Sequence, residues 1–241
     1  MKKEPLISIS DLTVSYDHEP VFEHVNLTIY RGDQIALIGA NGSGKTTLLK
    51  TILGLKKQDE GTLTITPSLR IGYLPQVLQI ADRFFPMSVE EVILQGRRSR
   101  KRFLSWLTAQ DRHFLNELVG PFHAQELLKK RFGYLSMGQK QLVLFLRMLA
   151  QEPDVVFLDE PTSSLDVARK DSLYAMLEIL KKNKVAYVII THDLPSFDKI
   201  IDRVVLIEHS ILFDGDHRAF CEHPEFSPFI HTHHGDHHEH S

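Results

Sequence analysis

The residues with the clearest chemical potential are Gly39 to Thr46, which read GANGSGKT. A glycine, four residues and then Gly-Lys-Ser/Thr is the spacing of a phosphate-binding loop when a strand precedes it and a helix follows it. Glycines let successive backbone N–H groups point inward, and the next helix adds the positive end of its dipole. A polyphosphate is therefore held by dipoles that are already in place.

Two side chains of this loop have separate roles. Lys45 is placed to reach the β- and γ-phosphates, and the Thr46 hydroxyl to ligate Mg²⁺. A glycine-rich turn with a stray lysine is the simpler alternative, but Gly42 and Gly44 are in register with the rest of the motif. The predicted nucleotide contacts here are Gly39, Ala40, Asn41, Gly42, Ser43, Gly44, Lys45, Thr46 and Thr47.

Two acids, Asp159 and Glu160, end the apolar run VVFLDE. Ligands of open α/β sheets gather at the carboxyl ends of the strands. Asp159 is suited to hold Mg²⁺, directly or through water, and Glu160 to orient and polarise an attacking water. Alone, the pair is as consistent with an ordinary loop as with a site, but the phosphate-binding loop in the same chain favours a site.

The segment YLSMGQKQLVLFLRML has two interpretations that are compatible. Ser136 and Gln139 have the S-x-x-Q spacing of a helix capping box, and an apolar helix follows. The same helix N-terminus, with its exposed amides, is also a site for an anion.

With these segments in this order, the chain resembles the ATP-binding subunits of ABC transporters over roughly residues 6 to 220. LSMGQ looks like the signature loop of that family and lies just upstream of VVFLDE, as the family order requires. Four further positions match family motifs: Tyr16 as the aromatic that stacks on adenine, Gln76 in YLPQ, Asp166 in SSLD and His192 in IITHD.

The resemblance implies ATP hydrolysis by a homodimer whose two copies pack head to tail around two ATP molecules. Each ATP then contacts the phosphate-binding loop of one copy and Ser136, Gly138 and Gln139 of the other. Water attacks the γ-phosphorus while Mg²⁺ and Lys45 spread the developing charge, and Glu160 acts as the base.

The resemblance also assigns roles to His192, which senses the γ-phosphate, and to Gln76, which links metal and water to a neighbouring helical segment. The implied magnesium ligands are Thr46, Gln76 and Asp159. Simpler alternatives stay open, because Tyr16 could be a β-surface aromatic, Gln76 a polar loop residue and His192 a strand-end histidine.

Two departures from the family pattern matter. Met137 stands where the family usually has glycine, although Ser136 and Gly138 remain, so we expect the phosphate contact to survive. The hairpin EHSILFDG lacks the glycine that is usual in its turn.

The elements that must position these residues alternate along the chain. Strand patterns occur in LISISDLTV, VNLTIY, QIALIG, GTLTI and RIGYLPQ, and a helix begins at Lys45. Residues from about Ser88 to Lys130 are helical in character, and another helix follows YLSMGQ. After VVFLDE come a helix (ARKDSLYAMLEILKK), a strand (VAYVIITH), a short helix (LPSFDKII) and a β pair around RVVLIEHSILFDG.

This alternation predicts an α/β fold with a mostly parallel sheet covered by helices. The resemblance makes it a P-loop NTPase of the ABC type, with an N-terminal antiparallel β subdomain and an inserted helical subdomain at about 77–150. The ATP-binding domain is expected over 6–223, and a mobile, histidine-rich tail over 224–241.

Composition narrows the class of protein. The chain has 241 residues, 42% of them hydrophobic, with a formal charge of -3. The single cysteine, Cys221, fits a reducing cytosol. The N-terminus lacks a signal peptide's apolar core, and no apolar run reaches the roughly 18 residues of a membrane span, so we expect any membrane role to need a partner.

Three functions are consistent with the motifs: an ATPase that drives a separate permease, a soluble ABC ATPase acting on ribosomes or DNA, and a nucleotide-binding regulator. A single phosphate-binding loop and too few residues between Gln76 and Leu135 for a long coiled coil favour transport. The basic run at 97–102 is read as a solvated helix face or a patch near lipid headgroups rather than a nucleic-acid site.

The chain ends HTHHGDHHEHS, with histidines interrupted by other residues, which favours a native metal-binding tract over an appended tag. Imidazoles beside carboxylates suit Zn²⁺, Ni²⁺ or Cu²⁺. The candidate tail ligands are His231, His233, His234, His237, His238 and His240.

The sequence is most similar to the zinc and manganese importer branch of the family, and the tail favours zinc because Mn²⁺ prefers oxygen ligands. The expected cofactors are ATP and Mg²⁺, with Zn²⁺ a candidate ligand of the tail. The expected partners are an integral membrane permease and, indirectly, an extracytoplasmic metal-binding protein, with no nucleic acid. The expected location is the cytoplasmic face of the membrane, and an importer of manganese or another substrate is the alternative.

Overall fold

The computed structural model describes residues 4–75, 85–98, 108–161 and 167–226. One sheet is antiparallel, with the strand order β2-β1-β4, and contains β1 (Pro5–Tyr16), β2 (Glu19–Tyr30) and β4 (Glu60–Ile65). Alternating residues of β1 are buried, and Ile9 and Val14 lie opposite Leu27 and Phe22 of β2. The period-2 pattern thus produces one apolar face, as the sequence predicted.

The second sheet has the order β5-β6-β7-β3-β8-β9. Its strands are β3 (Gln34–Ile38), β5 (Ile71–Leu74), β6 (Val155–Asp159), β7 (Ala186–Ile190), β8 (Arg203–Ile207) and β9 (Ile211–Asp216). All neighbours are parallel except β8 and β9. Every residue of β3, β6 and β7 is buried, which explains their continuous apolar runs. The predicted α/β class with a mostly parallel sheet is confirmed.

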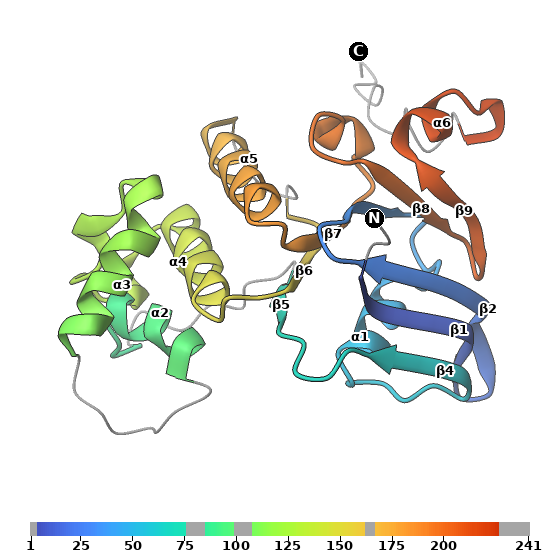
Figure 1. The fold of residues 1–241 in the computed structure, drawn as a ribbon, viewed down its shortest axis with the longest axis horizontal. Helices are drawn as coiled ribbons and strands as arrows, with labels where there is room; N and C mark the ends of the chain where they lie inside the picture. The colour runs from blue at the N-terminus through green and yellow to red at the C-terminus, as the bar shows by residue number, and fades with distance from the viewer. Residues whose placement is uncertain (1–3, 76–84, 99–107, 162–166, 227–241) are drawn as a thin grey trace, which may run out of the picture.

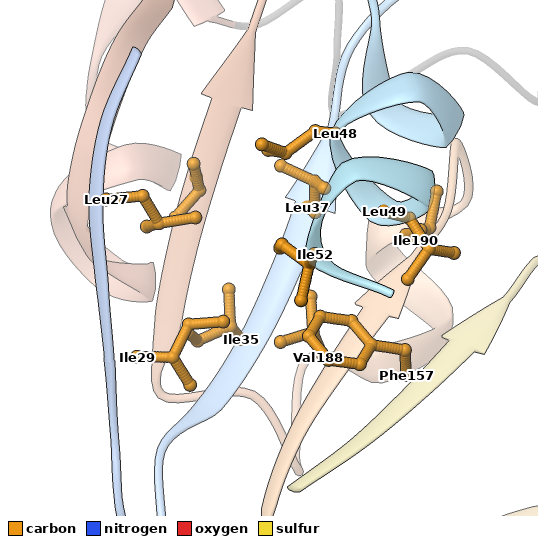
Figure 2. Close-up of a pocket in the computed structure, with 11 residues that line it drawn as sticks. Leu27, Ile29, Ile35, Leu37, Leu48, Leu49, Ile52, Phe157, Val188 and Ile190 are labelled. Carbon is orange, nitrogen blue, oxygen red and sulfur yellow. The ribbon is translucent and has the colours of Figure 1, made fainter. Parts of the chain in front are cut away.

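One hydrophobic core joins the two sheets through α1 (Lys45–Ile52). Figure 2 shows Leu48, Leu49 and Ile52 of this helix directed at side chains from β2, β3, β6 and β7. A void of only about 10 Å³ is left among them. This tight packing fixes the helix that follows Gly39–Thr46, and with it that loop.

A second core covers the other face of the parallel sheet, because alternate residues of β3 and β7 belong to different cores. It includes Phe145 of α4 (Met137–Leu149), Leu177 of α5 (Val167–Lys182) and Phe220 of α6 (His217–Cys221). Phe226 of the 3-10 turn Pro224–Phe226 stacks on Phe220 with ring centroids 5.0 Å apart, so this turn packs against α6.

Three helices, α2 (Val89–Arg98), α3 (Ala109–Val119) and α4, form a third core to one side of the sheets (Figure 1). Where α2 crosses α4, a Cβ on Gly96 would lie 1.9 Å from the carbonyl oxygen of Arg147, so only glycine fits there. Residues from about Ser88 to Lys130 are not helical throughout. Short 3-10 turns at Gly120–Phe122, Gln125–Leu127 and Phe132–Tyr134 follow α3, and Pro121 has no N–H for a helical hydrogen bond.

The sequence predicted a short helix over LPSFDKII. The structure has only a 3-10 turn there, at Leu194–Phe197, so the predicted helix was too long. Asp193 accepts a hydrogen bond from the N–H of Ser196 and holds this short turn. Among the described residues, none of the helices combines the length and apolarity that a membrane span requires.

Candidate active site

The carboxyl ends of three adjacent strands, β3, β7 and β6, supply the candidate site. The loop Gly39–Thr46 runs from β3 into α1. Gly39 has φ +153°, and a Cβ there would lie 2.1 Å from the carbonyl oxygen of Ile207. Gly44, with φ +101°, precedes α1 and has no side chain to cap the helix. The first-turn amides of α1 are therefore left without intrahelical or side-chain acceptors, which suits them to a phosphate.

Lys45 is 8% exposed and folds back over its own loop. Its Nζ donates to the carbonyl oxygens of Gly39 at 2.8 Å and Ala40 at 2.7 Å. Burial lowers the pKa of Lys45, while the carboxylates of Glu160, Glu208 and Asp159 oppose that shift. To bind a phosphate, the ammonium has only to exchange carbonyl oxygens for phosphate oxygens.

An open cleft of about 220 Å³ brings most of the predicted loop residues together with Asp159 and Glu160, while Gly39, Ala40 and His192 do not line it. It is lined by Asn41, Gly42, Ser43, Gly44, Lys45, Thr46, Thr47, Asp159, Glu160 and Ile190. A hydroxyl (Thr46) and a carboxylate (Asp159) thus line one cleft with the phosphate-binding loop. Mg²⁺ takes few protein ligands, all oxygen, and completes its shell with water and substrate phosphates, so this donor set fits it.

Asp159 is nearly buried, and burial raises its pKa, with a second contribution from neighbouring Glu160. Lys45 and a hydrogen bond with Tyr73 of β5 act in the opposite direction. Burial also raises the pKa of Tyr73, which keeps its hydroxyl protonated as a donor to Asp159. The carboxylate is therefore held in a costly ionised form that a divalent cation would relieve.

Glu160 and His192 form a pair across the ends of β6 and β7. Oε1 of Glu160 and Nδ1 of His192 are 2.8 Å apart. The backbone of Glu160 is left-handed, with φ 49°, and its N–H donates to the carbonyl oxygen of Ile190 at 2.9 Å. A strained backbone at a strand end is typical of functional positions. It directs this carboxylate into the cleft that Lys45 also lines.

The structure does not bring Tyr16 or the segment from Ser136 to Gln139 into this cleft; none of them is among its lining residues in the described part of the chain. Tyr16 ends β1, is 44% exposed, and has Lys56 Nζ 4.3 Å from its ring centroid. Met137, the residue in place of the family glycine, is also exposed.

The predicted capping box at the start of α4 is confirmed. Oγ of Ser136 accepts from the N–H of Gln139 at 3.3 Å, and Oε1 of Gln139 accepts from the N–H of Ser136 at 3.1 Å. The amides of Met137 and Gly138 have no partner within the helix. This exposed end of α4 is therefore able to donate N–H groups to an anion, as the predicted contact requires.

The predictions for Gln76, for Asp166 and for the tail histidines at 231–240 lie outside the described residues. Among the residues that the structure does describe, no group of three or more His, Cys, Asp and Glu is arranged to hold a metal ion.

One residue that sequence reasoning missed is Glu208, in the turn between β8 and β9. Its Oε1 accepts from the N–H of Ala40 at 2.5 Å. The sequence holds a signal for it, because Glu208 follows a strand as Asp159 and Glu160 do. What the sequence does not reveal is that β8 lies beside β3. Tyr73 was missed for the same reason, since β5 had to be placed beside β6.

The chain is similar in sequence and in fold to known proteins. The family model described as ABC transporter matches residues 22–163. The zinc import ATP-binding protein ZnuC of Marinobacter nauticus is 35% identical over 224 residues, which cover 92% of this chain and 82% of that protein. The high-affinity zinc uptake system ATP-binding protein ZnuC of Bacillus subtilis is 33% identical over 210 residues, or 84% of this chain and 91% of that one.

Solved structures of ABC transporters have a fold similar to that of this chain. An ABC transporter assigned to the metal-chelate type, in an inward-facing conformation, superposes with a TM-score of 0.81 at 28% identity, over 94% of this chain and 89% of that chain. The ATP-binding subunit of another ABC transporter gives a TM-score of 0.76 at 25% identity, over 89% of this chain and 91% of that chain.

Proposed function

This chain belongs to the ABC transporter family, and we propose that it is the ATP-hydrolysing subunit that drives zinc import through a separate membrane permease. The observation that carries the catalytic part is the cleft lined by the phosphate-binding loop, Asp159 and Glu160, whose carboxylate is paired with His192. The cargo rests on relatives that are named for zinc import and are more than 30% identical to this chain.

The geometry supports hydrolysis in steps that the residues of this chain perform. Loop amides and Lys45 bind the β- and γ-phosphates of ATP. Thr46 and Asp159 would hold Mg²⁺, which neutralises phosphate charge when it is bound. Glu160 accepts a proton from the attacking water and, oriented by His192, aligns it with the γ-phosphorus. Water and ATP become ADP and inorganic phosphate, with the leaving oxygen retained on ADP.

A second copy of the chain completes the site. None of the described residues that line the cleft comes from α4, and the exposed N-terminus of α4 offers further N–H donors for an anion. We infer a head-to-tail homodimer in which Ser136, Gly138 and Gln139 of one copy contact ATP on the other. Tyr16, exposed at the end of β1, stacks on the adenine once Lys56 moves aside.

The remaining partners follow from this function. The subunit docks on an integral membrane permease at the cytoplasmic face of the membrane, and an extracytoplasmic metal-binding protein delivers zinc to that permease. In this proposal the histidines at 231–240 sense imported zinc. Gln76 links the metal and the water to the helical segment, and Asp166 takes the place of the aspartate in the family motif SSLD.

A growth experiment tests the cargo. Cells that lack this chain should grow poorly when zinc is chelated, and should recover with added zinc or with the wild-type chain, but not with the Lys45→Ala chain. Recovery with manganese alone would contradict zinc as the cargo and favour a manganese importer. Normal growth under zinc and manganese limitation would contradict metal import altogether.

A further inference from the structure

Residues 207–210, which are the last residue of β8 and the turn into β9, contact the phosphate-binding loop at successive points. The carbonyl oxygen of Ile207 lies so close to Gly39 that a Cβ would be 2.1 Å away. Glu208 accepts from the N–H of Ala40 at 2.5 Å. The N–H of His209 donates to the carbonyl oxygen of Ser43 at 3.3 Å. The turn therefore follows the loop from its first residue to its fifth.

The same turn is anchored to β2. Nδ1 of His209 lies 2.8 Å from the carbonyl oxygen of Val21, and the N–H of Glu23 donates to the carbonyl oxygen of His209 at 2.8 Å. A Cβ on Gly44 would lie 3.0 Å from the ring of Phe22, so β2 also packs on the far end of the loop. Hydrogen bonds to the backbone of β2 thus hold the turn in place.

His209 explains how a hairpin without glycine makes this contact. Its backbone is left-handed, with φ 59°, a conformation that glycine adopts more readily. A histidine can be kept there because its N–H, its carbonyl and its ring nitrogen each have a partner. The cost of this conformation indicates that the surroundings over-determine the turn.

Ala40 is held from two sides, by Glu208 on its N–H and by Lys45 on its carbonyl oxygen. Binding of ATP removes one of these, since Lys45 must leave the carbonyl for a phosphate. The contact from Glu208 does not compete with the nucleotide, because Glu208 is not among the described residues that line the cleft. Of the contacts from Lys45 and Glu208, the one from Glu208 can therefore persist through the catalytic cycle.

We propose that Glu208 is a positioning residue, which holds the phosphate-binding loop in its nucleotide-binding conformation after Lys45 has turned to the phosphates. This inference rests on the proposed function, since it assumes that the loop binds ATP. Glu208 holds the loop through the hydrogen bond that it accepts from the N–H of Ala40.

The test compares Glu208→Ala with Glu208→Gln in the full chain. The glutamine keeps an acceptor for the N–H of Ala40, and the alanine does not. Loss of a charge-assisted bond that fixes a binding loop should raise the Kd for Mg-ADP and the KM for ATP about 10- to 50-fold in Glu208→Ala. The kcat at saturating ATP should stay within about 2-fold, because bound phosphates re-impose the loop conformation. Glu208→Gln should remain within about 3-fold of the wild type in Kd.

Asp216→Ala is the matched control, because Asp216 also accepts from backbone N–H groups, those of Arg218 and Ala219 at the start of α6. It should lower Tm without changing the Kd for Mg-ADP. Equal Kd values for wild type and Glu208→Ala, with Lys45→Ala still deficient, would overturn the positioning role alone. A Glu208→Gln chain as deficient as Glu208→Ala would also overturn it. A wild-type chain that binds neither nucleotide would contradict the proposed function as well.

Discussion

The loop Gly39–Thr46 and the segment Ser136–Gln139 both lead into a helix whose N-terminus faces a phosphate in the proposed complex, yet they are built in opposite ways. Helix α1 starts at Gly44 with no side-chain cap, and its loop is held by Lys45 and Glu208. Helix α4 is capped by its own Ser136 and Gln139. The first N-terminus has no side-chain acceptor for its amides, whereas the second is capped by its own side chains and is exposed.

This difference separates the residues proposed for hydrolysis from those proposed for contact between two copies of the chain. The residues proposed to hydrolyse ATP converge within one chain, at the ends of β3, β6 and β7. The segment at Ser136 lies outside this cleft, and in the proposed dimer it contributes when another copy presents ATP to it. Changes in the first region should abolish turnover, and changes in the second should affect only the assembled dimer.

The largest effect is expected from Glu160→Gln. The amide preserves shape and a hydrogen bond to His192 but cannot accept the proton of water, so ATP hydrolysis should fall at least about 10²-fold. Binding of Mg-ATP should be kept, as measured by equilibrium binding to the purified chain. Turnover near the wild-type rate would remove Glu160 from the role of base.

A smaller effect is expected from Ser136→Ala, which removes a helix cap and a phosphate contact. The cap alone should cost about 0.5–2 kcal/mol of stability. Hydrolysis by the assembled transporter should fall about 10-fold, the size expected for one lost hydrogen bond to a charged group. The Kd of the isolated chain for Mg-ADP should not change.

Thr108→Ala is its control, because Thr108 and Asp111 form the same kind of capping box at the start of α3. It should cost similar stability and leave hydrolysis unchanged. If both alanine variants lowered hydrolysis alike, the effect at Ser136 would be one of stability rather than of phosphate contact.

The smallest effect is a gain of stability in Asp159→Asn. The pKa of Asp159 is raised in the folded chain, so its ionised form opposes folding at neutral pH; the penalty shrinks as pH falls through that raised pKa and is gone below the ordinary pKa of an aspartate. In magnesium-free buffer at pH 7 the variant should have a Tm higher by about 2 °C, a gain that vanishes in acid.

Asp154→Asn should lower the stability of the folded chain. Burial opposes its charge, but hydrogen bonds from Arg70 and Arg31 outweigh that cost and hold the pKa of Asp154 below its ordinary value. Its stabilisation is present at neutral pH and is lost as pH falls through that lowered pKa. The variant should therefore melt at a lower temperature than wild type at pH 7. Shifts of the same sign in both variants would contradict this assignment of the two carboxylates.

The sequence predicted those features that depend on neighbours in the chain. The apolar runs before Gly39 and Asp159 identify buried strands, and S-x-x-Q at Ser136 identifies a helix start, because each pattern reflects a local period or cap. It did not predict the contact of Glu208 with Ala40 or that of Tyr73 with Asp159. Those depend on which strands lie side by side, and that order is set by packing across the whole sheet.

The end of the helical segment shows the same limit. Apolar periodicity continued from Ser88 to Lys130, but the chain turns after Val119 because Leu127 and Phe132 reach the third core through short 3-10 turns. Local propensity does not contain that tertiary requirement.

A mixing experiment tests most directly the central claim, that each ATP lies between the Gly39–Thr46 loop of one copy and Ser136 of the other. Lys45→Ala and Ser136→Arg chains, each inactive alone, are mixed in equal amounts before assembly with the permease. About a quarter of wild-type hydrolysis should return, because half of the dimers are mixed and each of these has one intact site of two. A mixture as inactive as its components would contradict the claim.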